Sequence, residues 1–341
     1  MRKQARCVSP ALVSATLIVI FGCTTAAAPS ENPKLVPLKK VADVPLPGPA
    51  VRFDYQSLDA SHGRLYIAHM NADQLVVFDT KKRGVVANLD GFPNVHGVWA
   101  VPELKKVYAS ATGEHKVAVV DMETLKTIAR VGPVKYPDGI AYAPGPKRIF
   151  VSDEHGDADA VIDAITNSLV TTIPLGGGAG NTVYDPASGH ILVAVHEKNE
   201  LVAIDPATAK IIGRYAVAGI ESPHGIALDV ATRLAFVAGE DNSKLAAVDL
   251  TNMQVLATYP VGKDPDVLAF DPGLKRLYVS AESGNVTVFR ENGKALVTEG
   301  TLSMPHAHTV CVDPDTHLVY FPLQSVDGHP LLRIMEPSGN R

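Results

Sequence analysis

The stretch HGIALD, residues 224–229, places a histidine and a glycine ahead of a short β-rich run. Related stretches are DYQSLD, HGVWAV, DGIAYA, GNTVYD, DVLAFD and HTVCVD, which begin at residues 54, 96, 138, 180, 266 and 308. Successive copies lie 42 residues apart, except for one step of 44 between 180 and 224. A constant period of this length indicates a repeat architecture.

Each repeat contains more than this one β-rich run. A second series follows about eleven residues later, as in LYIA from 65, VYAS from 107 and LYVS from 277. Two further apolar runs complete each unit, with turn residues between all four, and helical periodicity is nowhere sustained. Seven units of about 42 residues with four strands each predict an all-β, seven-bladed β-propeller with antiparallel blades.

The two ends of the repeat region predict how the ring closes. The last unit, from residue 308, offers only three strands and finishes at PLLRIM, residues 330–335. The segment KKVADVPLPGP, residues 39–49, matches the fourth-strand pattern of the other units. We expect this N-terminal strand to close the last blade, which leaves the ring without a break.

The repeat sequences resemble those of a known family. PDGIAYAPGPKRIFVS, from 137, and PHGIALD followed by RLAFVA, from 223, are similar to the YVTN-type β-propeller repeats. The resemblance extends over nearly all of residues 39–337. It implies the propeller fold but little about activity, because propellers of this kind carry many functions.

The N-terminal residues predict export. A basic head, MRKQAR, precedes the apolar run ALVSATLIVIFG, which is too short to favour a transmembrane helix. We interpret 1–22 as a signal, 23–38 as a tether, 39–337 as the propeller and 338–341 as a tail. IFGC, ending at Cys23, resembles a bacterial lipobox, so we expect lipidation of Cys23. The alternative is ordinary cleavage near TAAA, residues 25–28.

The expected location is therefore the periplasm or cell envelope. Thr24, and no aspartate, follows Cys23, which by the same resemblance favours an outer-membrane lipoprotein held to the membrane by its lipid alone. The chain has a net charge of −5, and loss of the basic signal would make it more acidic. Nucleic acid is accordingly the least expected partner.

Two rings of residues are predicted to surround a central funnel. The first ring occupies the start of each inner strand, and the second follows the second strand of each blade. The first ring comprises Asp54, His96, Asp138, Gly180, His224, Asp266 and His308. The second comprises Met70, Thr112, Glu154, His196, Glu240, Glu282 and Gln324.

Two interpretations of these rings remain open. Asp and His at strand starts bond readily to turns and to neighbouring blades, which is a structural role. Crowded carboxylates and imidazoles also favour a cation or a hydrogen-bonding ligand. Gly180 would leave a gap in the first ring where such a ligand could fit.

The histidines raise the question of a divalent metal ion. His96, His224 and His308 suit zinc, copper or nickel, and the carboxylates suit harder ions. His306 should point the same way as His308 if both lie in one strand. However, the three ring histidines stand on blades 2, 5 and 7, so a single three-histidine zinc site is weakly specified.

Taken together, these features favour a non-catalytic binding or scaffold module of the cell envelope. The funnel would present its rings to a small molecule, a metal ion or an envelope protein. No catalytic constellation is fixed by the sequence. The alternative is a metal-assisted lyase or hydrolase that uses the same His/Asp/Glu funnel.

Overall fold

The computed structural model describes Met1 and residues 36–338. The interpreted signal, Cys23 and most of the tether lie outside the described residues, as do the last three residues of the tail. Within residues 36–338 the helical segments are 3₁₀ turns of three residues each. No helix in this part of the chain is long and apolar enough to cross a bilayer.

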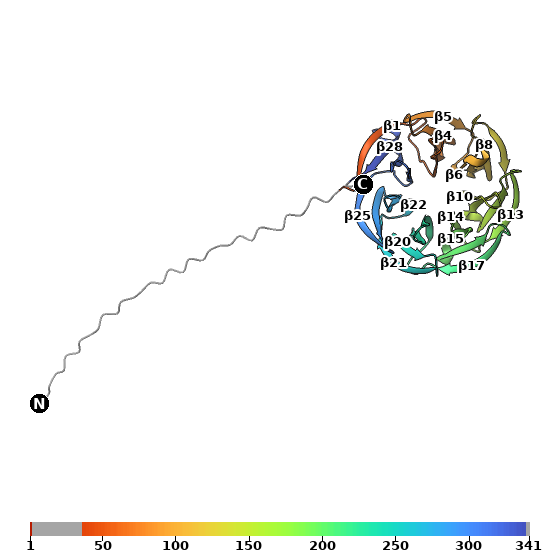
Figure 1. The fold of residues 1–341 in the computed structure, drawn as a ribbon. Helices are drawn as coiled ribbons and strands as arrows, with labels where there is room; N and C mark the ends of the chain where they lie inside the picture. Colours follow the sequence, from red (N-terminus) through yellow and green to blue (C-terminus); the bar gives the residue numbers. More distant parts are fainter. Residues whose placement is uncertain (2–35, 339–341) are drawn as a thin grey trace. The chain divides into compact units, whose positions relative to one another are not determined.

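Seven four-stranded antiparallel sheets are arranged in a ring, as the repeat predicted (Figure 1). Blade 1 contains β2 (Gln56–Asp59), β3 (Arg64–His69), β4 (Gln74–Asp79) and β5 (Gly84–Asp90). Blade 2 contains β6 (Val95–Val101), β7 (Lys106–Ala111), β8 (Lys116–Asp121) and β9 (Thr127–Val131). Blade 3 contains β10 (Pro137–Ala143), β11 (Arg148–Asp153), β12 (Ala158–Asp163) and β13 (Ser168–Pro174). Blade 4 contains β14 (Ala179–Asp185), β15 (His190–Val195), β16 (Glu200–Asp205) and β17 (Lys210–Ala216).

The remaining blades continue the same order from the channel outward. Blade 5 contains β18 (Pro223–Asp229), β19 (Leu234–Gly239), β20 (Lys244–Asp249) and β21 (Gln254–Pro260). Blade 6 contains β22 (Pro265–Asp271), β23 (Arg276–Ala281), β24 (Asn285–Asn292) and β25 (Ala295–Ser303). Blade 7 contains β26 (Cys311–Val312), β27 (Val319–Val326), β28 (His329–Pro337) and β1 (Leu38–Pro45).

The expected closure by an N-terminal strand is confirmed. β1 pairs antiparallel with β28, from Leu38 opposite Pro337 to Pro45 opposite Leu331 (Figure 1). Across this pair Arg333 donates to both carboxylate oxygens of Asp43, from Nε and Nη2, at 2.8 Å each. The first and last described strands thus share one sheet, and the blade is completed by both ends of the chain.

The core fills the spaces between blades. One apolar cluster combines Tyr66 and Val77 of blade 1 with Val98 and Val107 of blade 2, and similar clusters recur around the ring. Alternate side chains of the twisted sheets pack against the next blade in this way. The strand starts near the channel are therefore held by packing on both sides.

An irregularity in the inner strands directs the first-ring side chains. In blades 2 to 6 the pairing of the inner strand shifts register immediately around the ring residue, for example between Pro223 and Ile226. A bulge of this kind re-aims a side chain. The glycine after His224 is required there, because a Cβ on Gly225 would lie 2.0 Å from the carbonyl oxygen of Asp266.

Stability should depend on pH through one buried acid, Glu291 in β24, which is 4% exposed. Burial, and then the neighbouring Asp229, raise the pKa of Glu291 from 4.5 to about 7. The raised pKa favours the protonated form in the folded state. Stability is therefore greatest below the ordinary pKa and falls as pH rises towards and through 7.

Glu291→Gln removes this ionisation, since the amide stays neutral. We expect the free energy of unfolding of the variant, relative to wild type, to increase by on the order of 1–2 kcal/mol as the pH is raised from 5 to 8. Urea unfolding at pH 5 and at pH 8 measures this increase. The exposed control Glu221→Gln should show no such difference, and a gain that is equal at pH 5 and pH 8 would contradict the explanation.

Candidate functional site: an acidic central funnel

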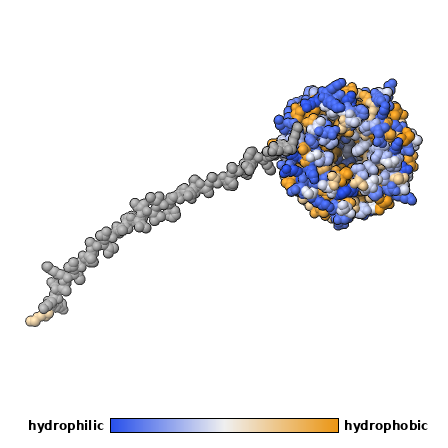
Figure 2. All heavy atoms as spheres, viewed as in Figure 1, coloured by the Kyte–Doolittle hydropathy of each residue, from blue (hydrophilic) through white to orange (hydrophobic). Residues whose placement is uncertain are grey.

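The centre of the ring is hollow (Figure 2), and one end of the hollow is a polar pocket of about 210 Å³. We call this pocket the funnel. Residues of both predicted rings line it, together with three side chains that the sequence did not single out. The lining comprises Arg52, Asp54, Tyr55, Met70, His96, Tyr136, Asp138, Glu154, His224, Glu240, Asp266 and Glu282.

The six polar first-ring side chains are each between 2% and 7% exposed. Five of them line the funnel, and His308 lies beside its floor, in contact with Asp54 and Asp266. His224 Nε2 lies 3.3 Å from Asp266 Oδ1, and His308 Nε2 lies 3.5 Å from Asp54 Oδ1. His96 Nε2 lies 3.9 Å from the other oxygen of Asp54. Equivalent positions of different repeats therefore meet around one axis.

The second-ring carboxylates lie above this floor. Glu154, Glu240 and Glu282 each follow directly after the second strand of their blade and line the funnel. Burial first, and then the charge of Asp266, raise the pKa of Glu240 to about 7, although His224 opposes the shift. Burial and the charge of Asp54 likewise raise the pKa of Asp138 to about 7. The funnel is thus crowded with acids that resist ionising together.

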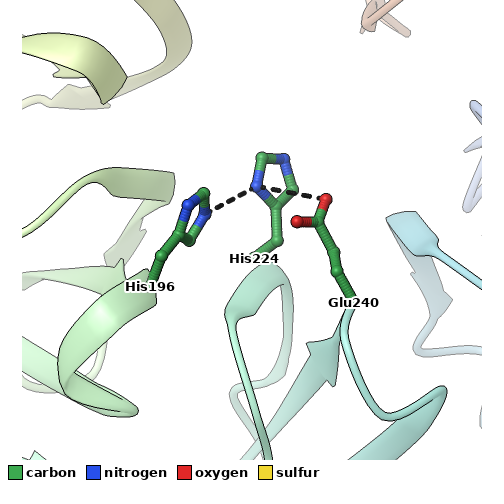
Figure 3. A group of neighbouring side chains, drawn as sticks. All are labelled: His196, His224 and Glu240. Atoms are coloured by element: carbon green, nitrogen blue, oxygen red, sulfur yellow. Dashed lines mark hydrogen bonds and ion pairs between the residues drawn. The ribbon is translucent and has the colours of Figure 1, made fainter.

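His224 connects several of these groups. Its Nδ1 lies 2.9 Å from His196 Nε2 and 3.6 Å from Glu240 Oε1 (Figure 3). Burial lowers the pKa of His224, but the contact with Asp266 and the charge of Glu240 outweigh it and raise the pKa well above its ordinary value. Burial, and then the charge of His224, lower the pKa of His196 to about 4. A charged His224 can therefore donate to a neutral His196.

The structure corrects the expected gap at Gly180. A Cβ on Gly180 would lie 2.7 Å from His196 Nε2 and 2.9 Å from His224 Cα. The space is therefore filled from the neighbouring positions, and no room is left there for a ligand. The glycine permits the contact between His196 and His224.

The structure also corrects the placement of His306. This residue is exposed, has a φ of 67° and lies in a turn before β26, so it does not share a strand with His308. The other histidines of the predicted metal set, His96, His224 and His308, fall into three separate clusters. The four imidazoles do not converge on one point, because His96, His224 and His308 stand on different blades and His306 is exposed in a turn.

Tyr55 is the most important side chain that the sequence reasoning missed. Its Oη lies 3.2 Å from Asp138 Oδ2 and 3.1 Å from His224 Nε2, across the channel from blade 1. It lines both the funnel and a second cavity of about 280 Å³ with Trp99, Ile226 and Phe270 in its walls. Tyr55 therefore closes the funnel floor. A signal was present, because the equivalent positions include Gly97, Gly139 and Gly225.

Arg52 and Tyr136 were missed as well, although both stand two residues before a first-ring position. Arg52 Nη2 lies 2.8 Å from Glu282 Oε1 and 3.9 Å from Asp266 Oδ2. Tyr136 Oη lies 3.2 Å from His96 Nε2. Among the described lining residues Arg52 is the one that carries a guanidinium or ammonium group. Its closest carboxylate contact is Glu282 of the second ring.

Fold and funnel together define the class: a seven-bladed β-propeller with an acidic, closed-floored central pocket. No family model matches the chain. Protein NirF of Stutzerimonas stutzeri is 26% identical over 192 residues, covering 51% of this chain and 48% of that protein. The chain thus spans about half the length of this curated relative.

Solved structures agree on the fold. A chain of the Kuenenia stuttgartiensis hydrazine synthase superposes with a TM-score of 0.73 at 14% identity, over 92% of this chain and 100% of that chain. The RRP9 WD40 repeats superpose with a TM-score of 0.74 at 10% identity, over 88% and 100%. At these identities the likeness concerns the propeller architecture alone.

Proposed function

We propose that the protein is a binding module whose funnel takes a small cation, either a divalent metal ion or the ammonium end of a small molecule. The observation that carries this proposal is the charge of the funnel. Six carboxylates line it, against two cations, the guanidinium of Arg52 and the charged imidazole of His224. Because like charges in a buried site repel, a bound cation would stabilise the ionised forms of these acids.

The size of the funnel supports a small ligand. Pockets for drug-sized molecules enclose about 300–1,000 Å³, whereas the funnel encloses about 210 Å³ above Tyr55. Such a volume suits an ion with its bound water or one charged group of a larger molecule. The rest of a larger molecule would remain outside the rim.

Calorimetric titration tests the proposal with two probes, Mn²⁺ and the diammonium compound putrescine. We expect at least one to bind wild type, and a Glu154→Gln/Glu240→Gln/Glu282→Gln variant to bind about 10-fold more weakly or worse. His224→Ala/Asp266→Ala should also lose binding. A variant with the same net charge, Glu123→Gln/Asp315→Asn/Glu336→Gln, should retain it. If neither probe binds wild type, the proposal is wrong.

A second function is favoured by one observation on the floor. Tyr55 Oη and His224 Nε2 lie 3.1 Å apart beside Asp266, which gives a proton donor next to carboxylates that could hold a metal. A metal-assisted hydrolase or lyase would use His224 in general acid–base catalysis, typically a 10²–10⁴-fold contribution. Hydrolysis of p-nitrophenyl acetate by Mn²⁺-loaded protein, lost in His224→Gln, would support it. If wild type shows no turnover, the enzymatic function is wrong and the binding function stands.

We also propose export and attachment to the outer membrane through a lipid on Cys23, with an envelope protein or small molecule as partner. The basic head, the short apolar run and IFGC support this. The intact mass of the mature chain checks it. An acylated N-terminal Cys23 is expected, whereas an unmodified N-terminus near residues 25–28 would favour ordinary cleavage.

A further inference from the structure

The funnel floor contains three groups of side chains with the composition of a metal site. They are His196, His224 and Glu240; Asp54, Asp266 and His308; and Asp54, His96 and Asp138. In each group the potential ligand atoms lie within 4.8 Å of one another. The groups differ in whether their imidazole nitrogens already have hydrogen-bond partners within the protein.

Two of the groups have internal partners for their imidazoles. His224 and His196 bond to each other, and His224 also contacts Tyr55. His96 contacts Tyr136 through Nε2 and the carbonyl oxygen of Asn94 through Nδ1. These imidazoles therefore have hydrogen-bonding roles in the protein itself.

His308 is different. It is 7% exposed, and its Nε2 is buried without a hydrogen-bond partner among the described residues. The nitrogen is aimed between two carboxylates, 3.5 Å from Asp54 Oδ1 and 3.9 Å from Asp266 Oδ2. A buried polar atom left without a partner costs about 1–3 kcal/mol. A ligand that bonds this nitrogen and both oxygens would remove the cost.

We propose that Asp54, Asp266 and His308 bind one divalent first-row transition-metal ion. With bonds of about 2.1 Å, the ligand atoms of a tetrahedral ion are about 3.4 Å apart. The observed separations of 3.5 and 3.9 Å need only small side-chain movements to reach this value. Two carboxylates also match the charge of the ion. This inference rests on the proposed cation-binding function and names its site.

Arg52 approaches one of these oxygens without bonding it. Its Nη2 bonds Glu282 at 2.8 Å and lies 3.9 Å from Asp266 Oδ2, the same distance as His308 Nε2. The other oxygen of Asp266 faces His224. One oxygen of Asp266 and one of Asp54 therefore remain directed at His308.

The ligand set also limits the choice of ion. Carboxylates suit manganese, and imidazole suits iron or zinc, so a set of two oxygens and one nitrogen favours a first-row ion such as Mn²⁺, Fe²⁺ or Zn²⁺ over Ca²⁺. Three protein ligands leave at least one coordination position open. That position would hold water or the polar group of a molecule bound in the funnel.

Metal titration of the untagged protein tests the site, with Mn²⁺ and Zn²⁺ as probes and His69→Ala as the matched control. His69 is a fully buried histidine of β3 that belongs neither to the funnel lining nor to any of the three groups. We expect wild type and His69→Ala to bind the ion, and His308→Ala and Asp266→Asn to lose about 100-fold or more in affinity. Equal binding by His308→Ala and wild type would overturn the assignment.

A measurement on wild type alone covers the case in which these variants fold poorly. The anomalous signal of Mn²⁺ or Zn²⁺ in a crystal should lie between His308 Nε2, Asp54 Oδ1 and Asp266 Oδ2. A peak at another group of the funnel, or no bound ion, would overturn the inference. If putrescine binds and neither metal does, the metal site fails while the cation-binding function stands. If no probe binds, both fail.

Discussion

Tyr55→Ala should open the funnel floor and lower the free energy of unfolding by about 3 kcal/mol, the usual scale for removing a large packed aromatic ring. The ring separates the funnel from the second cavity and bonds to Asp138 and His224. Without it the two cavities would join into a water-filled channel. Guanidinium unfolding measures the loss of stability, and a crystal structure would show the channel.

Tyr55→Phe is the control that separates the ring from the hydroxyl. It keeps the floor closed and removes only the contacts to Asp138 and His224, so we expect a loss of about 1 kcal/mol. The alanine variant should be clearly less stable than the phenylalanine variant. Equal stabilities of the two would mean that the ring does not pack as a floor, and only its hydroxyl matters.

Val44→Pro should also lower the free energy of unfolding, because it interrupts the closure of the ring. Val44 pairs with Leu332, and the nearby bond from the Leu46 amide to the Pro330 carbonyl, at 3.0 Å, places alternate amides of β1 in the ladder. Proline removes one such donor and leaves the opposite carbonyl without its partner, at a cost of about 1–3 kcal/mol. Thermal unfolding measures the loss, and chromatography should reveal association through the exposed edge of β28.

Val36→Pro is the matched control for the closure. Val36 is 59% exposed and precedes β1, so the substitution should change the stability by less than about 0.5 kcal/mol. If Val44→Pro melts at the wild-type temperature, the ring does not depend on β1. Because neither residue lies in the funnel, both predictions are independent of ligand binding.

Most of the fold could be predicted from the repeat. A period of 42 residues places equivalent residues at equivalent positions, so the blades, their order and the closing strand could be predicted from spacing. The same logic brought Asp54 and His308, 254 residues apart, to one floor. The period alone determines which blade a residue belongs to and where it lies along the channel axis. These two facts were enough to locate the funnel.

The directions of individual side chains could not be predicted in this way. The inner strands bulge at the ring positions, and a bulge changes where a side chain points. His196 fills the space beside Gly180, and Tyr55 crosses the channel where other repeats have glycine. His306 lies in a left-handed turn, as do the equivalent residues Asn94, Ser222 and Asp264. The placements of His196 and Tyr55 are departures from the repeat, and they determine the chemistry of the floor.

The closing strand has a mechanical consequence. Tension carried by the N-terminal segment would enter the propeller at Leu38, where β1 pairs with Pro337, the last residue of β28. The antiparallel pairs would then be strained one after another, and the Lys39–Glu336 ion pair, at 3.3 Å, would be reached early. Beyond the bulge at Lys40 and Ala42, the two-bond clasp of Asp43 and Arg333 resists further peeling. Under a pulling force, β1 would therefore separate from β28 starting at Leu38, and Asp43 and Arg333 would be the point at which the separation is held.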